Sequence, residues 1–513
     1  MHRQYITTAI DYPNAPPHMG HVLEKVLADV CARWMRLRGD EVRFQIGTDE
    51  HGIKIQQTAD KEKVTPRELV DRNVPLFREL YDRLCISCDH FIRTSDQKEH
   101  WPTVIELWKR LQRAGVLEKR TYTGLYCSGC ERFLTKRDLV DGLCENHRKA
   151  PQEVKEENWF FLLSKEQKWL QKLLKKEYKI LPAFRENETT SLMEQGLEDV
   201  SFSRPKSSLS WGVPVPDDEG QTMYVWCDAL TNYISGLGYF TKNEQRQWWE
   251  KPAEVTHVIG KDIARFHALI WPAMLKAAEV RSPDRLLIHG FLTSEGQKMS
   301  KSLGNVVKPE EVLEKFSGNP DPLRFYVSQE IPVGNDGDFS WKRIEETYIG
   351  VMSNKIGNLL NRVLVLLKKE GSTIAVPEDT KMSAAVKKHW KAYEQAMNSF
   401  ALSDALIAQA VALAMEGNVS MDESKPWTLK GDERMEVLGS IAEKLRHISL
   451  MLLPFIPVTA QKISKQLNVP YAEEMLNKNF VLKNEQRDLT TWGSLGKSWK
   501  TVGEPSILFP PLL

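Results

Sequence analysis

The first fifty residues constrain the fold most strongly, because they alternate between two kinds of periodicity. Residues 5–10 are rich in β-forming side chains, and a loop with proline, asparagine and alanine at 11–17 leads into a helical pattern. The apolar positions of that pattern are Val22, Leu23, Val26, Leu27, Val30 and Trp34. A second strand-like segment follows at 41–46. This order predicts a βαβ unit with parallel strands, in which ligands bind at the carboxyl ends of the strands.

The rest of the chain predicts two further kinds of structure. Strand-like segments at 223–226, 255–259 and 285–289 predict that the parallel sheet resumes after an interruption of about a hundred residues. Further on, apolar residues follow helical spacing at 354–369, 383–414 and 432–452. The expected fold class is α/β: a Rossmann-type parallel-sheet domain, split by an insertion and followed by an all-α domain.

Five regions are expected along the 513 residues, since a chain of this length exceeds one ordinary core. The first half of the parallel-sheet domain is placed at 1–115 and its second half at 221–295. The insertion lies between them at 116–220. A loop-bearing region at 296–347 follows, and the α-domain spans 348–513.

Composition limits the location and the partners. Hydrophobic residues make up 41% and charged residues 27%, as in ordinary globular proteins, and the apolar stretch at 448–453 is too short to span a membrane. We therefore expect no membrane association. Seven cysteines in so long a chain fit a reducing compartment, so a cytoplasmic location is expected. The net charge of +1 does not indicate a nucleic-acid-binding protein, so any RNA contact must come from local patches.

A short motif lies where the first predicted strand turns into its helix: His18, Met19, Gly20 and His21. A helix start offers backbone N–H groups and a positive dipole to phosphate, and two imidazoles there can donate to the same phosphates. Gly20 has no side chain, which would let a flat adenine lie against the backbone. Taken alone, the motif fits two surface histidines at a helix start equally well.

A second motif, Lys-Met-Ser-Lys-Ser at 298–302, lies in a loop after the last predicted strand. Lys298 and Lys301 can neutralise the charge that develops on phosphates as pyrophosphate leaves, although two lysines alone are usually a solvated basic loop. Together the motifs resemble the HIGH and KMSKS sequences of class I aminoacyl-tRNA synthetases, with Met19 in place of isoleucine. The resemblance implies that ATP is bound and activated by His18, Gly20, His21, Lys298 and Lys301.

Around these motifs nearly the whole chain resembles the methionyl-tRNA synthetases. The similar segments are 8–10, 47–52, 224–230 and 259–267. The resemblance implies that methionine and ATP, with Mg²⁺, form methionyl-adenylate and pyrophosphate, and that methionine then passes to the 3′-terminal ribose of tRNA(Met), first at the 2′-hydroxyl. It also implies that Asp49 holds the α-ammonium group. The implied lining of the side-chain slot is Ile10, Trp226, Ala229, Leu230, Tyr233, Ile263 and His267.

Such a lining suits methionine, because an unbranched thioether is polarizable and gains from aromatic faces. Tyr233 and His267 could offer a polar contact to sulfur, and charged amino acids would be rejected. Leu230 stands where many relatives carry proline. Without the flanking matches, these side chains would be ordinary core residues.

Two pairs of candidate metal ligands lie in the insertion: Cys127 with Cys130, and Cys144 with His147. Each pair is separated by two residues, and four soft donors on two tight turns favour a closed tetrahedral site over free thiols. A closed site has no position for substrate, so a structural Zn²⁺ is expected. Cys85 and Cys88 have the same spacing without a second pair nearby, which favours packing.

In the α-domain, Asn358 and Arg362 lie four residues apart on one predicted helix face. Trp427 follows a proline and offers a plane for stacking on an unpaired base. Alone, these residues fit a capped helix and a half-buried tryptophan. The resemblance implies that they read a CAU anticodon, that 348–513 is the anticodon-binding domain, and that 296–347 carries the KMSKS loop and contacts the tRNA stem.

Three alternatives differ from this interpretation. A synthetase for isoleucine, valine or leucine would need a longer insertion to edit near-isosteres. A cysteine-specific enzyme would place zinc in the amino-acid pocket rather than in the insertion. A non-catalytic RNA-binding protein that kept the fold would have no need of His18, His21, Lys298 and Lys301. No appended RNA-binding domain is visible after the α-domain, so a monomer is expected.

Overall fold

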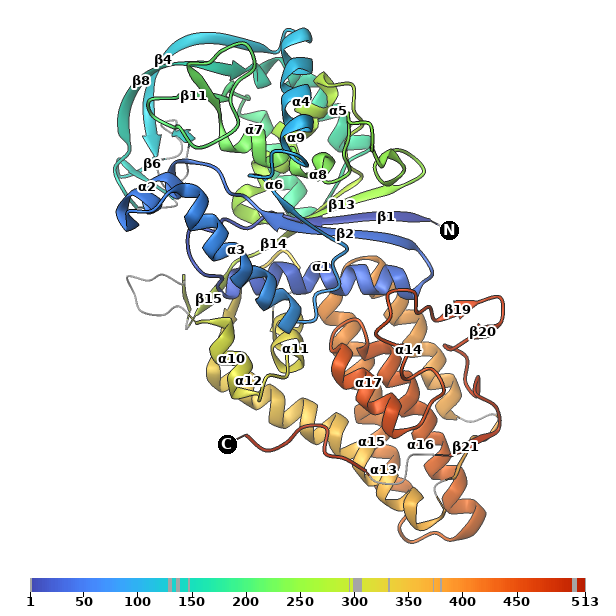
Figure 1. The fold of residues 1–513 in the computed structure, drawn as a ribbon. Helices are drawn as coiled ribbons and strands as arrows, with labels where there is room; N and C mark the ends of the chain where they lie inside the picture. Colours follow the sequence, from blue (N-terminus) through green and yellow to red (C-terminus); the bar gives the residue numbers. More distant parts are fainter. Residues whose placement is uncertain are drawn as a thin grey trace.

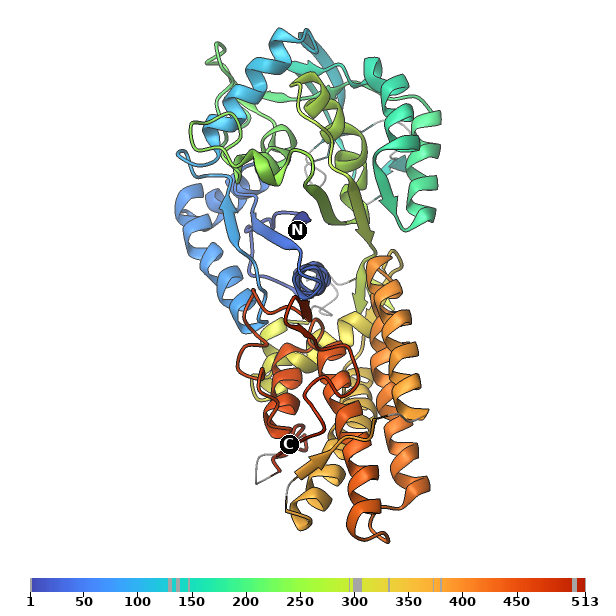
Figure 2. The same ribbon diagram turned by 90° about the vertical axis from the view of Figure 1, so that its right-hand side faces the viewer.

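The computed structural model describes residues 2–127, 132–134, 139–145, 148–294, 296–298, 307–330, 333–371, 373–378, 381–500 and 505–512. An α/β part lies at one end of the molecule and a helical part at the other (Figures 1 and 2). No helix in the described ranges has both the length and the apolar character needed to cross a bilayer.

A six-stranded parallel sheet forms the centre of the α/β part, in the order β3-β2-β1-β13-β14-β9. Its strands are β1 (Arg3–Thr8), β2 (Glu41–Thr48), β3 (His90–Arg93), β9 (Lys179–Leu181), β13 (Glu254–Gly260) and β14 (Arg285–His289). Helix α1 (Met19–Leu37) connects β1 to β2, so the predicted βαβ unit is confirmed. The predicted strands at 255–259 and 285–289 are confirmed as β13 and β14.

Helices cover both faces of this sheet (Figure 1). One face packs against α1 and α3 in a core that continues into the helical part, and the other packs against α4 and α9 in a second core. The helices of this part are α2 (Ile53–Glu62), α3 (Pro66–Arg83), α4 (Trp101–Arg113), α7 (Val225–Leu230), α8 (Asn232–Ser235), η3 (Arg246–Trp248), η4 (Lys261–Ile263), η5 (Phe266–Ile270) and α9 (Trp271–Ala277). Layers of this kind are those of a doubly wound α/β fold.

A second, antiparallel sheet lies within the range of the predicted insertion, in the order β10-β8-β4-β5. Its elements and their neighbours are β4 (Leu117–Cys127), β5 (Arg132–Leu134), β6 (Leu139–Val140), β7 (Leu143–Cys144), β8 (Gln152–Phe161), η2 (Leu163–Glu166), α5 (Gln167–Lys176), α6 (Ala183–Glu194) and β10 (Val200–Ser201). Strands β4 and β8 pair from Leu117 opposite Phe161 to Tyr126 opposite Gln152. Between α5 and α6 the chain adds β9 to the edge of the main sheet.

The predicted strand at 223–226 is wrong as a strand of the parallel sheet. Strand β12 (Gln221–Met223) ends at the first residue of the predicted segment and pairs antiparallel with β11 (Ser203–Pro205). Helix α7 then begins at Val225. Most side chains of this segment are buried whichever way they point. A short apolar run buried all round has the same appearance in a strand and in a helical turn, so periodicity could not separate them.

Residues 307–371 lead from the sheet into the helical part. Their elements, with the preceding hairpin, are β15 (Leu292–Ser294), β16 (Gln297–Lys298), α10 (Pro309–Lys315), α11 (Asp321–Glu330), β17 (Gly337–Phe339), α12 (Trp341–Thr347), the π-helical η6 (Tyr348–Gly357) and α13 (Asn358–Lys369). The fully buried Arg324 in α11 donates to the carbonyl oxygens of Leu84, Pro454 and Phe455 and forms a 2.7 Å ion pair with Asp29 of α1. This arginine therefore fixes the helical part against the helix that follows β1.

The helical part contains α14 (Lys381–Asn398), the π-helical η7 (Asp404–Val411), α15 (Ala412–Ser424), α16 (Gly431–Leu452) and α17 (Pro457–Gln466), with the short strands β18 (Thr373–Ala375), β19 (Lys483–Asn484), β20 (Arg487–Asp488) and β21 (Ser498–Lys500). The predicted helix at 432–452 is confirmed as α16. The helical segment predicted at 383–414 is confirmed as helical, but it is interrupted, because the chain turns between α14 and η7. Phe400 lies in that turn with a φ of 61°, a conformation that ends a right-handed helix.

Candidate active site

The strand order reverses between β1 and β13, which makes their carboxyl ends the expected ligand crevice of the sheet. Ile10 follows β1, Asp49 follows β2, and Ile263 ends η4 directly after β13. Backbone hydrogen bonds hold the first two segments together, since the N–H of Asp11 donates to Gly47 at 2.9 Å and that of Asp49 donates to Asp11 at 2.8 Å. Three of the predicted methionine-binding residues therefore come from adjacent strand ends.

His18 and His21 form the cap of α1 with their own side chains. The backbone N–H of Gly20 donates to Nδ1 of His18 at 3.1 Å, and the backbone N–H of His18 donates to Nδ1 of His21 at 3.0 Å. The two rings stack with centroids 3.9 Å apart. A Cβ on Gly20 would lie 3.0 Å from Cε1 of His18, so any larger residue would push that ring aside by a few tenths of an ångström.

This cap fixes which ring nitrogens face outward as donors. An Nδ1 atom that accepts a hydrogen bond carries no proton, so each neutral ring carries its proton on Nε2. Burial, the neighbouring His18 and the charge of Lys25 together lower the pKa of His21 well below its usual value. At neutral pH the turn therefore offers two imidazole N–H donors at the positive end of the α1 dipole, an arrangement that suits phosphate.

The lysine motif is only partly within the described residues. β15 follows β14, and the backbone of Lys298 pairs with that of Thr293 in the β15–β16 hairpin. β14 is parallel to β13, which is parallel to β1, so this hairpin leaves the sheet at the edge where α1 begins. Lys301 lies outside the described residues.

A buried charge cluster that sequence reasoning missed lies one helical turn behind His21. The fully buried Lys25 forms ion pairs with Asp11 at 2.7 Å and with Glu24 at 2.9 Å, and it donates to the carbonyl of Ala9 at 3.0 Å. Tyr81 donates to the other oxygen of Asp11 at 2.5 Å. Burial raises the pKa of Asp11 to about 6, with Lys25 opposing the shift. Burial also works to lower the pKa of Lys25, but its two carboxylate partners outweigh burial and raise it.

The same cluster reaches β14, because Glu24 contacts Nε2 of His289 at 3.2 Å, and Nδ1 of His289 lies 2.7 Å from the carbonyl of Gly290. The loop after β1, the first turns of α1 and the strand before the lysine hairpin are thus joined by one network. The only signal in the sequence was a lysine that lies among the apolar positions of the first helix.

The structure brings together several residues predicted to line a methionine slot. Tyr233 donates to Nε2 of His267 at 2.6 Å, and Nδ1 of His267 lies 2.9 Å from the carbonyl of Ile263, to which it can donate. Burial lowers the pKa of His267 to about 4, so its ring is neutral. Ala229 and Leu230 are buried in α7. Trp226, also in α7, stacks on Phe266 at 3.7 Å with an interplanar angle of 9°, a partner that sequence reasoning missed.

Two of the four predicted zinc ligands lie in the described residues. Cys127 ends β4 and Cys144 ends β7, and both thiols belong to one small buried cluster with Leu134. Cys130 and His147 lie outside the described residues. Among the residues that are described, no group of three or more metal-binding side chains comes together.

The predicted RNA-reading residues lie on the surface of the helical part. Asn358 is exposed at the start of α13, and Trp427 is 46% exposed after α15. The guanidinium of Arg362 lies 5.6 Å from the centre of the Trp427 ring and pairs with Asp422 at 2.7 Å. Arg362 and Trp427 therefore form one surface cluster, although 65 positions separate them by number.

A family model described as tRNA synthetases class I (M) matches residues 4–153 and 137–364, which together exceed half of the chain. This match, on a parallel sheet with a histidine-capped helix at its switch point, shows that the chain belongs to the class I tRNA synthetases.

Comparison with individual relatives identifies a family within this class. The chain is 40% identical to the methionine–tRNA ligase of Rickettsia conorii over 99% of this chain and 98% of the relative, and 40% identical to that of Brucella suis over 91% and 92%. A solved structure of Mycobacterium tuberculosis methionyl-tRNA synthetase in complex with methionyl-adenylate has a TM-score of 0.89 at 33% identity and full coverage of both chains. Within its class, the chain therefore belongs to the methionine–tRNA ligase family.

Proposed function

We propose that this chain activates methionine with ATP to give methionyl-adenylate and pyrophosphate, and then transfers methionine to the 3′-terminal ribose of tRNA(Met). The observation that carries the proposal is the turn at the start of α1, where two imidazoles present Nε2–H donors at the switch point of the sheet. The named relatives act as methionine–tRNA ligases, and this turn supplies the donors that a triphosphate needs.

In the proposed mechanism the methionine carboxylate attacks the α-phosphorus of ATP in line with the departing pyrophosphate. His18 and His21 hold phosphate oxygens through Nε2–H, and Lys298 and Lys301 neutralise charge on the leaving group. Mg²⁺ enters with ATP as part of the substrate complex. The chemistry needs positioning and charge stabilisation rather than a covalent enzyme intermediate, so the caps and buried pairs that hold the turn rigid are part of its function.

Asp49 is proposed to hold the α-ammonium group, with the side-chain slot formed by Ile10, Trp226, Ala229, Leu230, Tyr233, Ile263 and His267. The stacked Trp226 and Phe266 offer a polarizable aromatic surface to a thioether. His267 is neutral and its ring nitrogens face Tyr233 and Ile263, so the slot offers no countercharge to a charged side chain. This explains a preference for an apolar, unbranched substrate.

Pyrophosphate exchange with a panel of amino acids tests the proposed function. The chain, incubated with ATP, labelled pyrophosphate and one amino acid at a time, should exchange label with methionine and not with isoleucine, valine, leucine or cysteine. Exchange driven by one of those amino acids instead would overturn the proposal that methionine is the substrate. No exchange with any amino acid would favour a non-catalytic RNA-binding protein.

We propose that Cys127, Cys130, Cys144 and His147 hold one structural Zn²⁺. Two buried thiols that end strands β4 and β7 and share one small cluster fit a closed site. Zinc would tie the hairpins of the insertion together.

The protein should contain about one zinc per chain when purified without chelator. Cys144→Ser should lose the metal and lower the melting temperature, because a structural site contributes folding free energy. Cys85→Ser serves as the matched control and should keep the zinc. Emission analysis measures the metal directly, and metal-free wild-type protein would refute the site.

We propose that Asn358, Arg362 and Trp427 read a CAU anticodon, with the helical part as the anticodon-binding domain. An exposed aromatic ring beside a guanidinium and an amide is a surface that can stack on and hydrogen-bond to an unpaired base. We also propose that the chain acts as a monomer in the cytoplasm.

Trp427→Ala should lower kcat/KM for tRNA charging by about 10- to 100-fold, since stacking on one base is worth about 1–3 kcal/mol. Methionine-dependent exchange should be unchanged, because Trp427 follows α15, and α15 lies in the helical part, away from the sheet (Figure 1). Trp427→Phe keeps an aromatic plane and should retain most of the charging. Equal losses in charging and exchange would contradict the assignment.

A further inference from the structure

Two histidines bind one buried carboxylate on the α4 face of the sheet. Nδ1 of His51 lies 2.5 Å from one oxygen of Asp228, and Nε2 of His100 lies 2.6 Å from the other. His100 also contacts Oγ of Ser235 at 2.7 Å through Nδ1. All three side chains are almost completely buried, with exposed fractions of 2% for His51, 1% for Asp228 and 0% for His100.

The cluster connects the segments that carry the proposed methionine-binding residues. His51 lies in the loop after β2, two positions beyond Asp49. Asp228 lies in α7, the helix that also carries Trp226 of the slot, and Ser235 lies in α8 with Tyr233. The hydrogen bond from His51 to Asp228 is therefore a direct link between the loop for the ammonium group and the helix for the side chain.

Hydrogen-bond roles within the cluster follow from the carboxylate. Burial works to raise the pKa of Asp228, but His51 and His100 outweigh it and lower the pKa to about 2, so both oxygens accept. His51 must then carry a proton on Nδ1 to donate to Asp228, and its Nε2 atom lies on the other side of the ring. Among the described residues, this buried Nε2 atom has no hydrogen-bond partner.

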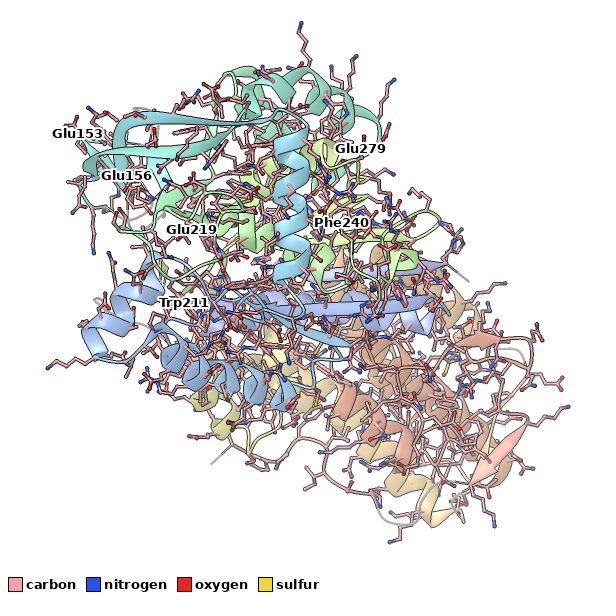
Figure 3. The ribbon with its side chains drawn as sticks, turned by 45° about the horizontal axis from the view of Figure 1, so that its top comes forward. Glu153, Glu156, Trp211, Glu219, Phe240 and Glu279 are labelled. Atoms are coloured by element: carbon pink, nitrogen blue, oxygen red, sulfur yellow. The ribbon has the colours of Figure 1, made fainter. Side chains whose placement is uncertain are left out.

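The surroundings of His51 hold its ring in place. Its ring centre lies 5.4 Å from that of Trp211 and 6.1 Å from that of Trp101. Trp211 donates to the carbonyl of Glu50 at 2.5 Å and packs against the apolar cluster of α2 and α3 (Figure 3). A buried charge with one unsatisfied ring nitrogen is not the simplest way to fill a core, so stability alone does not account for this arrangement.

We propose that His51 is a positioning residue for methionine: through its Nδ1–H bond to Asp228, it holds the loop that carries Asp49 at a fixed distance from α7. The inference rests on the proposed function, in which Asp49 holds the ammonium group. The link sets the geometry of the amino-acid site, whereas the phosphate-binding turn at α1 is held by its own side-chain caps. Methionine binding should therefore depend on His51, and ATP binding should not.

Two substitutions distinguish the hydrogen bond to Asp228 from the mere presence of a polar side chain at position 51. His51→Asn places an N–H donor near the position of Nδ1 and can keep the bond to Asp228. His51→Gln places its amide near the position of Nε2 and loses that bond. We expect KM for methionine to rise about tenfold or more in His51→Gln and to stay within about threefold of wild type in His51→Asn, with KM for ATP nearly unchanged in both.

Steady-state pyrophosphate exchange measures both KM values, and thermal denaturation is recorded for each variant. Equal effects of the Asn and Gln substitutions on KM for methionine would overturn the inference. A parallel rise of KM for methionine and KM for ATP, in proportion to the lost stability, would also overturn it. The wild-type chain is assayed first. Failure of methionine to drive exchange there would overturn the proposed function, and with it the inference, whereas an unchanged KM for methionine in His51→Gln would overturn the inference alone.

Discussion

His21→Asn should reduce the rate of methionine-dependent pyrophosphate exchange by about 10²- to 10³-fold while the protein remains folded, since this is the usual effect of removing one preorganised donor from a developing charge. In the structure Nδ1 of His21 accepts the backbone N–H of His18, which leaves Nε2 as the donor of the ring. Asparagine can take over the first role, because its side-chain oxygen reaches the same position and can accept the same N–H. It has no group at the position of Nε2.

His21→Gln is the matched control, because a glutamine at the third helical position can reach back to the N–H of His18, as in a capping box, and likewise has no imidazole Nε2–H. This variant should lose exchange as His21→Asn does and keep a melting temperature close to that of the wild type. Exchange kinetics and thermal denaturation on the same samples separate the two effects. Wild-type exchange in His21→Asn would show that the outward nitrogen does not contact the triphosphate.

Lys25→Met should destabilise the fold by about 3–5 kcal/mol, which is the usual cost of leaving buried charges without their partner. Lys25 is fully buried between Asp11 and Glu24, and methionine has a similar volume without a charge. Urea unfolding measures the loss. Part of the stability should return in the double variant Lys25→Met with Asp11→Asn, because one unpaired carboxylate is then removed.

The loss in Lys25→Met should also depend on pH. The folded-state pKa of Asp11 is already raised to about 6, above its unfolded value, so the folded protein holds an extra proton between these values and the contribution of Asp11 to stability falls as pH rises through that window. Removing Lys25 raises this pKa further. The free energy of unfolding that Lys25→Met loses should therefore be smaller near pH 5 than near pH 8. A loss that does not change with pH would contradict the assigned charges.

Sequence patterns predicted the first βαβ unit, β13 and β14, and failed where an element was very short, where an apolar segment buried all round was helical, and where a turn interrupted a helical pattern. Helix α1 carries apolar residues at helical spacing, and β1, β13 and β14 are runs rich in β-forming or apolar residues. Strand β9 has three residues, too few for a period, although it completes the sheet. The turn at Phe400 interrupts a helical pattern that continues on both sides, so only the backbone conformation reveals it.

The candidate site was predicted as a set of residue types and not as a set of contacts. Two histidines at a helix start indicated phosphate donors, but the use of their Nδ1 atoms as caps depends on ring orientation. Lys25 occupies a helix position that a pattern of apolar residues does not explain, and its partner Asp11 lies in a loop. His51 and Asp228 are 177 positions apart, so their contact arises only from the fold.

The central claim is that the histidine-capped turn and the lysine-bearing loop act on the same triphosphate. A crystal structure of the chain with methionine and a non-hydrolysable ATP analogue tests it most directly. The account predicts that Nε2 of His18 and Nε2 of His21 lie within hydrogen-bond distance of the phosphates, with Lys298 and Lys301 on the other side of the same chain of phosphates. A triphosphate bound where neither imidazole can reach it, or with the lysines facing another cavity, would contradict the account.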